Sequence, residues 1–346
     1  MRRGNGGRRA ASWWAVDSGP VLDPRILDVA RGAVRSAAGV CLGVLAEAPE
    51  APDSMAKLGR EPVTVADYGS QAVILEAVGG AFPDHEVVAE ERAELLLAEG
   101  EAAERVVRLT ARALGREVGL EDLVAWIDHR GGDDEPTWAI DPIDGTEGFL
   151  RREQFAIAVG LVVGGEPVAG VLGCPHFPID GRDPQRGTGV LYWGVVGEGA
   201  FAEPLHGGPV RRVSVSSRSD AGGVRVLGSV ESSHGDPALV RAVIAEAGLG
   251  GGMVRIDSQV KYGAVADGVA EVYLRPRNRP EYRERIWDHA AGAAIVTAAG
   301  GRVTDLDGAA LDFSTGSRLE ANRGVVATNG AVHDLVLEAL RTVESA

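Results

Sequence analysis

The 346-residue sequence is poor in cysteine, and its two cysteines, Cys41 and Cys174, lie far apart without a C-x-x-C motif. A disulfide framework and a zinc site both require paired or clustered cysteines, so neither is indicated. We expect both side chains to be small buried hydrophobic groups in a protein of a reducing compartment, the cytoplasm.

Positive charge is also scarce, because 35 lysines and arginines face 50 acidic residues and leave a formal net charge of −15. This balance argues against a nucleic acid polymer as partner, since such a partner calls for a basic surface. No stretch approaches the roughly 20 apolar residues of a membrane-spanning helix, so no membrane partner is expected. Residues 1–20 are predicted to be a disordered or basic extension without a secretory signal; the alternative is an organelle-targeting segment.

The most informative motif, Asp141-Pro-Ile-Asp-Gly-Thr146, follows an apolar run at residues 138–140. The run predicts the end of a buried strand, and Pro142 restricts the backbone so that Asp144 turns back toward Asp141. Two carboxylates this close repel each other unless a cation lies between them, and oxygen ligands suit Mg²⁺. The alternative is an ordinary strand-to-turn connection, where Asp, Pro and Gly are common.

Three further acidic segments lie at the ends of predicted elements. Asp67 follows Thr64 in the first turns of a helix, the Glu90-Glu91 pair ends a short strand, and Asp288 opens an Ala-rich helix. Asp67 and Asp288 could instead stabilise helix N-termini, where negative charge is favoured, and the glutamates could be solvated. Taken together, the acidic segments indicate a metal site assembled from the ends of several elements.

In combination, these motifs resemble those of the Mg²⁺-dependent, lithium-sensitive phosphatases of the inositol monophosphatase superfamily. The segments that carry this resemblance are 62–71, 90–91, 141–151 and 287–292. Within the superfamily the sequence is most similar to the 3′(2′),5′-bisphosphate nucleotidases. The features that favour this branch are Gly148-Phe-Leu-Arg151, the long spacer between Glu91 and Asp141, Glu231-Ser-Ser-His234, and the segments 255–263 and 272–275.

The resemblance implies two to three Mg²⁺ ions in one site. Their ligands would be Glu90, Asp141 and the Ile143 carbonyl for one ion, Asp141, Asp144 and Asp288 for a second, and Glu90 with Asp67 for a third, weaker ion. Such ions activate a water and neutralise the leaving oxygen. By the same resemblance, Asp67 and Thr146 orient and deprotonate the attacking water, and the transferred phosphate rests on the Gly145-Thr146 turn.

The resemblance also implies a pocket for a second phosphate. Ser258 and Lys261 are three positions apart, so on a helix they would share a face, and Arg275 would complete the cradle. His234 would lie near the sugar or the base. The alternatives are a helix cap for Ser258 and a solvated side chain for Lys261.

The sequence departs from the family pattern at a few positions. Ala89 stands where glycine is usual, which is tolerable unless its φ is positive. Glu61 stands where serine is common, and Glu147 where lysine is common. None of these changes removes a ligand, but they leave the affinity and the substrate preference open.

The expected fold is the family's layered αβαβα sandwich, of the α+β or α/β class. We expect a metal-binding subdomain at 21–205, with a helical insert at about 92–130, and an α/β subdomain at 206–346 that completes the nucleotide pocket. Helices are predicted at 24–48 and after Thr64, and antiparallel strands within 155–174 and 190–196. No internal repeat or heptad run is present.

The expected reaction is Mg²⁺-dependent removal of the 3′-phosphate from adenosine 3′,5′-bisphosphate, giving AMP and phosphate. The resemblance also implies action on 3′-phosphoadenylyl sulfate and inhibition by lithium, in a monomer or homodimer. An inositol phosphate or sugar phosphate phosphatase on the same fold is the nearest alternative. A non-catalytic nucleotide or metal sensor is the remote alternative, since the ligand set and the water-orienting pair are all present.

Overall fold

The computed structural model describes residues 22–47, 54–56, 62–132, 134–178, 189–230, 235–277, 279 and 281–345. The extension at 1–20, Glu61 and His234 lie outside the described residues.

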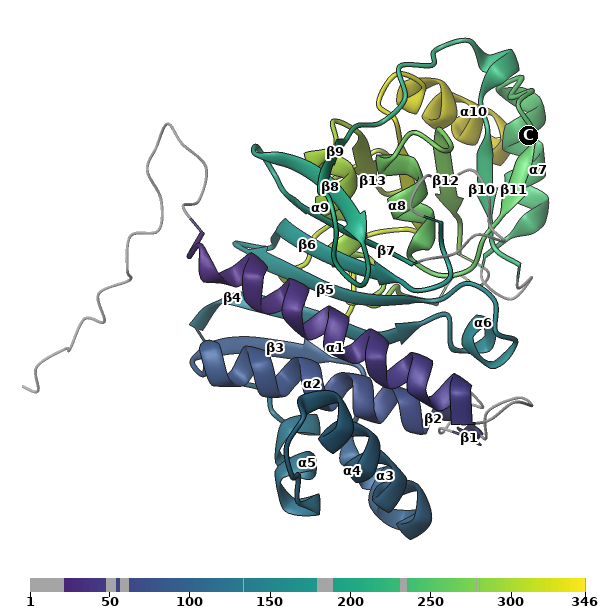
Figure 1. Ribbon diagram of the computed structural model, residues 1–346. Coiled ribbons are helices and arrows are strands. Elements are labelled where there is room, and N and C mark those ends of the chain that lie inside the picture. The colour runs from purple at the N-terminus through teal and green to yellow at the C-terminus, as the bar shows by residue number, and fades with distance from the viewer. Residues whose placement is uncertain are drawn as a thin grey trace, which may run out of the picture.

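The described elements stack in five layers, helix–sheet–helix–sheet–helix, which confirms the expected αβαβα sandwich (Figure 1). The first helical layer and the seven-stranded sheet that it covers consist of α1 (Arg25–Glu47), α2 (Val65–Ala81), β3 (His85–Ala89), β4 (Asp134–Asp144), β5 (Ala156–Val163), β6 (Glu166–Cys174), β7 (Val190–Val195), β8 (Gly199–Pro204) and β9 (Arg211–Val213). A short hairpin of β1 (Ser54–Ala56) and β2 (Pro62–Thr64) precedes α2.

The middle layer consists of α8 (Val260–Ala266) and α9 (Ala290–Ala298). Beyond it lie a second sheet, ordered β11-β10-β12-β14-β13, and the outer helices α7 (Pro237–Glu246) and α10 (His333–Ser345). The strands of this sheet are β10 (Val226–Gly228), β11 (Met253–Arg255), β12 (Val272–Arg275), β13 (Arg302–Thr304) and β14 (Val325–Thr328). The helices predicted at 24–48, after Thr64 and near Asp288, and the strands predicted within 155–174 and 190–196, are thus confirmed, with small differences at their ends.

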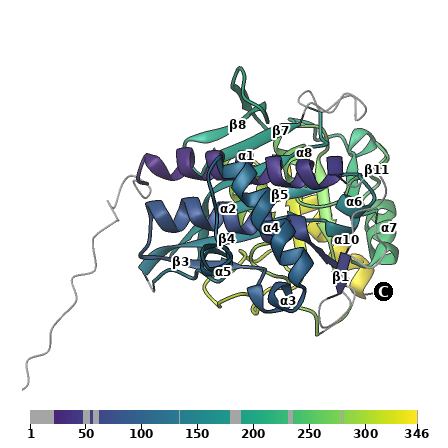
Figure 2. The same ribbon diagram turned by 60° about the horizontal axis from the view of Figure 1, so that its bottom comes forward.

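The predicted helical insert is present as α3 (Ala93–Ala98), α4 (Gly100–Leu114) and α5 (Leu120–Ile127). Helices α4 and α5 pack on α2 rather than on a sheet, and α4 also contacts α1. The turned view of Figure 2 shows this insert together with α1 and α2 on the same side of the first sheet. It therefore adds to the outer helical layer and forms no sheet of its own.

Helix α1 corrects the expectation that no stretch of the chain is long and apolar enough to span a membrane. Its 23 residues are long and apolar enough, by length and composition alone, to cross a membrane. Its apolar stripe is instead buried against α2, β5 and β6, as expected for a core helix of the sandwich. The two cysteines are also confirmed as buried free thiols, on α1 and β6.

Helix α9 lies very close to the first sheet because the sheet presents glycines, Gly160 of β5 and Gly170 of β6, to Ala290 and Ala291 of the helix. A Cβ built on Gly160 of β5 would lie 2.7 Å from the Cβ of Ala290, closer than real side chains approach. Asp288, just before α9, lies close enough to Asp141 and Asp144 of β4 for their charges to interact. Helix α9 thereby joins the two sheets into one core.

The first sheet also extends beyond residue 205, where the sequence placed the division between subdomains. Strand β9 pairs antiparallel with β8, so the chain leaves this sheet only after Val213. The second sheet begins with β10. Strand β9 is short and contains two arginines, so it has no apolar alternation from which its place in the first sheet could be predicted.

Candidate active site

The acidic motif lies on β4 and its continuation. Strand β3 runs parallel to β4 with Ala89 opposite Ile140, and the backbone N–H of Glu90 donates to the Ile140 carbonyl at 3.3 Å. This register brings Glu90 beside Asp141. Contrary to the expectation that the strand ends before Asp141, β4 pairs with β5 as far as Asp144. A register shift between Asp141 and Asp144 accommodates Pro142, which cannot donate to the ladder.

The substitution of glycine by Ala89 causes no backbone strain. Among the described residues other than glycine, a positive φ occurs only at Arg152 and Ser258. Ala89 belongs to β3 and is buried there, so its methyl group adds to the core beside Glu90.

The carboxylates of this region interact in a site that is buried at Asp67 and Asp141 and half-buried at Glu90, Asp144 and Asp288. Burial raises the pKa of Asp141 well above its ordinary value, and the neighbouring charges of Glu90, Asp144, Asp288 and Asp67 raise it further. Burial likewise raises the pKa of Asp288, to about 7. Buried like charges of this kind are costly unless a cation is held between them. The oxygen donor set therefore fits a hard divalent metal.

Asp144 differs from Asp141 in having positive neighbours. Burial raises its pKa, while Lys261, Arg275 and a hydrogen bond from the backbone N–H of Gln259 act in the opposite direction. That N–H donates to Asp144 Oδ2 at 2.6 Å. Asp144 thus lies at the boundary between the acidic cluster and the basic residues of the second half.

Asp67 and Thr146 approach each other from different elements. Asp67 Oδ2 accepts hydrogen bonds from the backbone N–H and the hydroxyl of Thr64, both at 2.7 Å, and caps α2. Its other oxygen, Oδ1, lies 3.5 Å from Thr146 Oγ1, and the Ile143 carbonyl lies 3.2 Å from the same hydroxyl, whose single proton can be donated to either oxygen. The helix-capping role and the site role are therefore served by different oxygens of one carboxylate.

Ser258 and Lys261 do not share a helix face. Helix α8 begins only at Val260, and Ser258 precedes it with φ 64°, in the left-handed region. Lys261 is buried rather than solvated; its Nζ donates to the Ile256 carbonyl at 3.0 Å and lies 5.2 Å from the Tyr273 ring centroid. Burial lowers the pKa of Lys261 to about 8.

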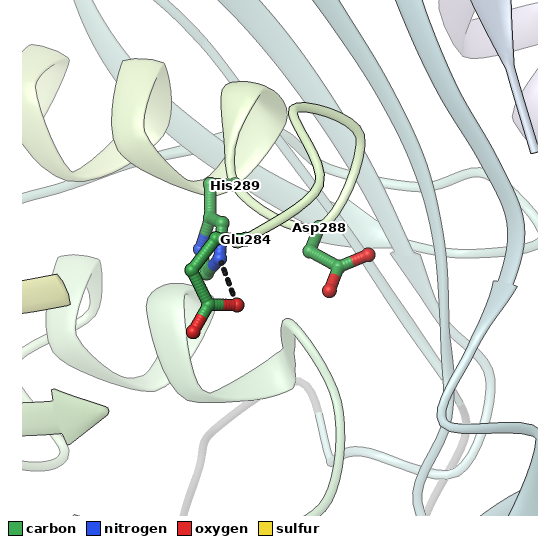
Figure 3. A group of neighbouring side chains, drawn as sticks. All are labelled: Glu284, Asp288 and His289. Carbon is green, nitrogen blue, oxygen red and sulfur yellow. Dashed lines mark hydrogen bonds and ion pairs between the residues drawn. The ribbon is translucent and has the colours of Figure 1, made fainter. Parts of the chain in front are cut away.

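Arg275 is held by two carboxylates at the end of β12. Its Nη2 lies 2.9 Å from Glu284 and 3.0 Å from Asp288. Glu284 is also hydrogen-bonded to His289 Nε2 at 3.1 Å, as Figure 3 shows, and His289 Nδ1 is hydrogen-bonded to the hydroxyl of Tyr262 at 2.7 Å. Neither Glu284 nor His289 was predicted as a site residue, although His289 directly follows Asp288 and Glu284 lies four positions before it.

The group of Glu284, Asp288 and His289 could hold a metal ion by the spacing of its ligand atoms. The Arg275 guanidinium already provides a positive charge to both carboxylates, and both ring nitrogens of His289 have partners. We therefore assign Asp288 to the acidic cluster on β4, and Glu284 and His289 to the support of Arg275.

Gln71, which the sequence motifs did not indicate as a site residue, supports the Glu90-Glu91 pair. Its Oε1 accepts the backbone N–H of Glu91 at 2.8 Å, and its Nε2 donates to the carbonyls of Glu91 at 2.9 Å and Ile127 at 2.8 Å. Arg130 donates to the same two carbonyls. These bonds fasten the end of the helical insert to the backbone next to Glu90.

Replacing Gln71 with alanine is expected to destabilise the protein by about 2 kcal/mol, because the buried backbone N–H of Glu91 loses its partner while the two carbonyls keep Arg130. Urea unfolding followed by circular dichroism measures this loss. Gln154→Ala, at a glutamine that donates to the carbonyl of His176, is the control and should cost less. An equal or smaller loss for Gln71→Ala would contradict its role as a brace.

Comparison with known proteins agrees with this geometry. Residues 25–345 match the family described as "Inositol monophosphatase family". A protein of Emericella nidulans named 3′(2′),5′-bisphosphate nucleotidase is 36% identical over 85% of this chain and 92% of its own length, and one of Oryza sativa with the same name is 37% identical over 91% and 93%. Solved structures with this fold include an inositol monophosphatase from Anabaena (25% identity, TM-score 0.59, covering 92% of this chain and 95% of that one) and an IMPase of Thermotoga maritima (20%, 0.63, 92% and 98%). The chain therefore belongs to the inositol monophosphatase family.

Proposed function

We propose that this chain is a Mg²⁺-dependent phosphatase that hydrolyses the 3′-phosphate of adenosine 3′,5′-bisphosphate to AMP and phosphate, and that also acts on 3′-phosphoadenylyl sulfate. The observation that carries the proposal is a buried cluster of carboxylates with Lys261 and Arg275 beside one of them, Asp144. Metal dependence is general in the family, and relatives of similar length bear the nucleotidase name. The proposed partner is a small nucleotide, and the proposed compartment is reducing, in keeping with the buried thiols.

The acidic cluster would hold two to three Mg²⁺ ions. Glu90, Asp141 and the Ile143 carbonyl would hold one, and Asp141, Asp144 and Asp288 another; Asp67 and Glu90 would serve a third. Bound there, the metal would neutralise phosphate charge and lower the pKa of a water molecule. Carboxylates at the ends of several elements can supply this set without moving a strand, because β3 and β4 already align Glu90 with Asp141.

The chain's own residues would orient and deprotonate the attacking water. The Thr146 hydroxyl lies between the Ile143 carbonyl and Asp67 Oδ1, so a water that donates to Thr146 Oγ1 can pass its proton toward Asp67. Asp67 keeps its orientation because its other oxygen is fixed by Thr64. The transferred phosphate would rest on the Gly145-Thr146 turn.

A second phosphate would be bound by Ser258, Lys261 and Arg275. Arg275 is hydrogen-bonded to Tyr273 and Tyr282 as well as to its two carboxylate partners, and a guanidinium has five N–H donors, so one donor would remain for a phosphate. An inositol phosphate phosphatase remains the second candidate, because the fold is shared with inositol monophosphatases. Its substrate inositol 1-phosphate has no second phosphate that could pair with the buried amine of Lys261.

The test is phosphate release with Mg²⁺ from adenosine 3′,5′-bisphosphate and from inositol 1-phosphate, with and without lithium. Preference for the nucleotide, suppressed by lithium, is expected. Preference for the inositol ester would retain the metal chemistry and refute the proposed substrate. Activity on neither would favour a non-catalytic role.

A further inference from the structure

The segment that precedes α8 is fastened to the turn that follows the acidic motif. A Cβ built on Gly145 would lie 2.9 Å from the Cβ of Ser258, so Ser258 packs where a side chain at position 145 would stand. The Gln259 N–H donates to Asp144, as described above. A further contact joins Arg151, at the end of α6 (Thr146–Leu150), to Asp257: Arg151 Nη2 lies 2.6 Å from Asp257 Oδ2.

Asp257 is the centre of this junction. Its side chain is 5% exposed, and its second oxygen accepts the backbone N–H of Val230, just beyond β10, at 3.1 Å. Gly148 of α6 leaves room for it, because a Cβ there would lie 3.2 Å from Asp257 Oδ2. One carboxylate thus holds together a helix attached to the first sheet and a strand end of the second.

The backbone at this junction needs such an anchor. Ser258 has a positive φ, a conformation that costs a non-glycine residue free energy and persists only where its surroundings impose it. The amine of Lys261 folds back to the Ile256 carbonyl, next to Asp257 in the chain. The position of both residues relative to Gly145 therefore depends on the junction.

We propose that Arg151 and Asp257 are positioning residues that set the distance between the turn for the transferred phosphate and the segment for the second phosphate. This inference rests on the proposed function. The pair selects substrates with two phosphates at one separation, and it does so without touching either phosphate. The charge-assisted hydrogen bond from Arg151 to the buried carboxylate of Asp257 is strong enough to fix that separation.

The experiment compares Arg151→Ala, Asp257→Asn and the double variant on adenosine 3′,5′-bisphosphate and on adenosine 3′-monophosphate, which lacks the second phosphate. In each variant the KM for the bisphosphate should rise about tenfold, as expected for losing one such bond. The double variant should show no larger rise, because both changes break the same contact. The KM for the monophosphate and kcat with either substrate should stay unchanged.

Arg302→Ala, which breaks an exposed pair with Asp334 at 2.7 Å, is the matched control and should change neither KM. Equal rises of KM for both substrates, a fall in kcat, or unchanged KM values would overturn the inference. A larger rise in the double variant would make Arg151 a direct phosphate ligand and also overturn it. If Asp257→Asn does not fold, the test rests on Arg151→Ala alone, at a side chain 35% exposed. The KM values of this variant for the two substrates are then compared. Failure of the proposed function is seen separately, as absence of bisphosphate preference in the unaltered protein.

Discussion

Asp141→Asn is expected to lower the turnover number by about three orders of magnitude or more and, at the same time, to raise the melting temperature measured without divalent metal. The pKa of Asp141 is raised well above its ordinary value by burial and by Glu90 and other carboxylates. Its charged form therefore destabilises the folded state at neutral pH. Asparagine removes that charge and keeps the Oδ1 acceptor that receives the Ile143 N–H at 3.1 Å.

The measurements are steady-state phosphate release with Mg²⁺ and thermal unfolding in EDTA and in Mg²⁺. Mg²⁺ should stabilise the unaltered protein and have a much smaller effect on the variant, because a ligand that binds the folded state alone raises its stability. The control is Asp334→Asn, at a side chain 87% exposed, which should change neither quantity. Near-normal turnover, or a lower melting temperature in EDTA, would show that Asp141 is not part of a metal site.

Thr146→Val is expected to lower kcat by about a hundredfold to a thousandfold, the usual contribution of a group that assists proton transfer. Valine keeps the shape of threonine but removes the hydroxyl that lies 3.5 Å from Asp67 Oδ1 and 3.2 Å from the Ile143 carbonyl. Thr146→Ser retains the hydroxyl and should recover most of the rate. Single-turnover phosphate release measures both variants.

Thr146 tests the water-orienting pair more cleanly than Asp67 does. Asp67 also caps α2 through its two bonds to Thr64, so its replacement would lower stability together with activity. The stabilisation by Mg²⁺ should be unchanged in Thr146→Val, since no metal is assigned to its hydroxyl. A kcat within a factor of about two of the unaltered protein would remove Thr146 from the proton path.

The layered fold could be predicted because its signals are local. The apolar stripe of α1 and the paired Val-rich strands β5 and β6 each follow from the spacing of apolar residues within one segment. Short polar strands were harder to predict. The residue pattern of strand β9 does not indicate to which sheet the strand belongs, and only its pairing with β8 shows that it belongs to the first sheet.

The acidic side of the candidate site could also be predicted, because carboxylates at element ends are visible in the sequence and the family motifs connect them. The basic side could not be predicted in detail. The three-residue spacing of Ser258 and Lys261 indicated one helix face, but α8 starts after Ser258. Whether a lysine is solvated or buried depends on what covers it, and Lys261 is covered by the core between the two sheets.

The sequence by itself determined the order of most helices and strands and the family, and it supplied the residues that are proposed to bind metal, because each of these depends on residue type and spacing along the chain. Only the tertiary structure decided which polar groups meet. Arg275 meets Glu284 and Asp288, Gln71 meets the backbone beside Glu90, and Asp257 meets Arg151. The physical reason is that a buried polar group must find a partner, and the partner comes from whichever element the packing of two sheets around α9 brings within reach.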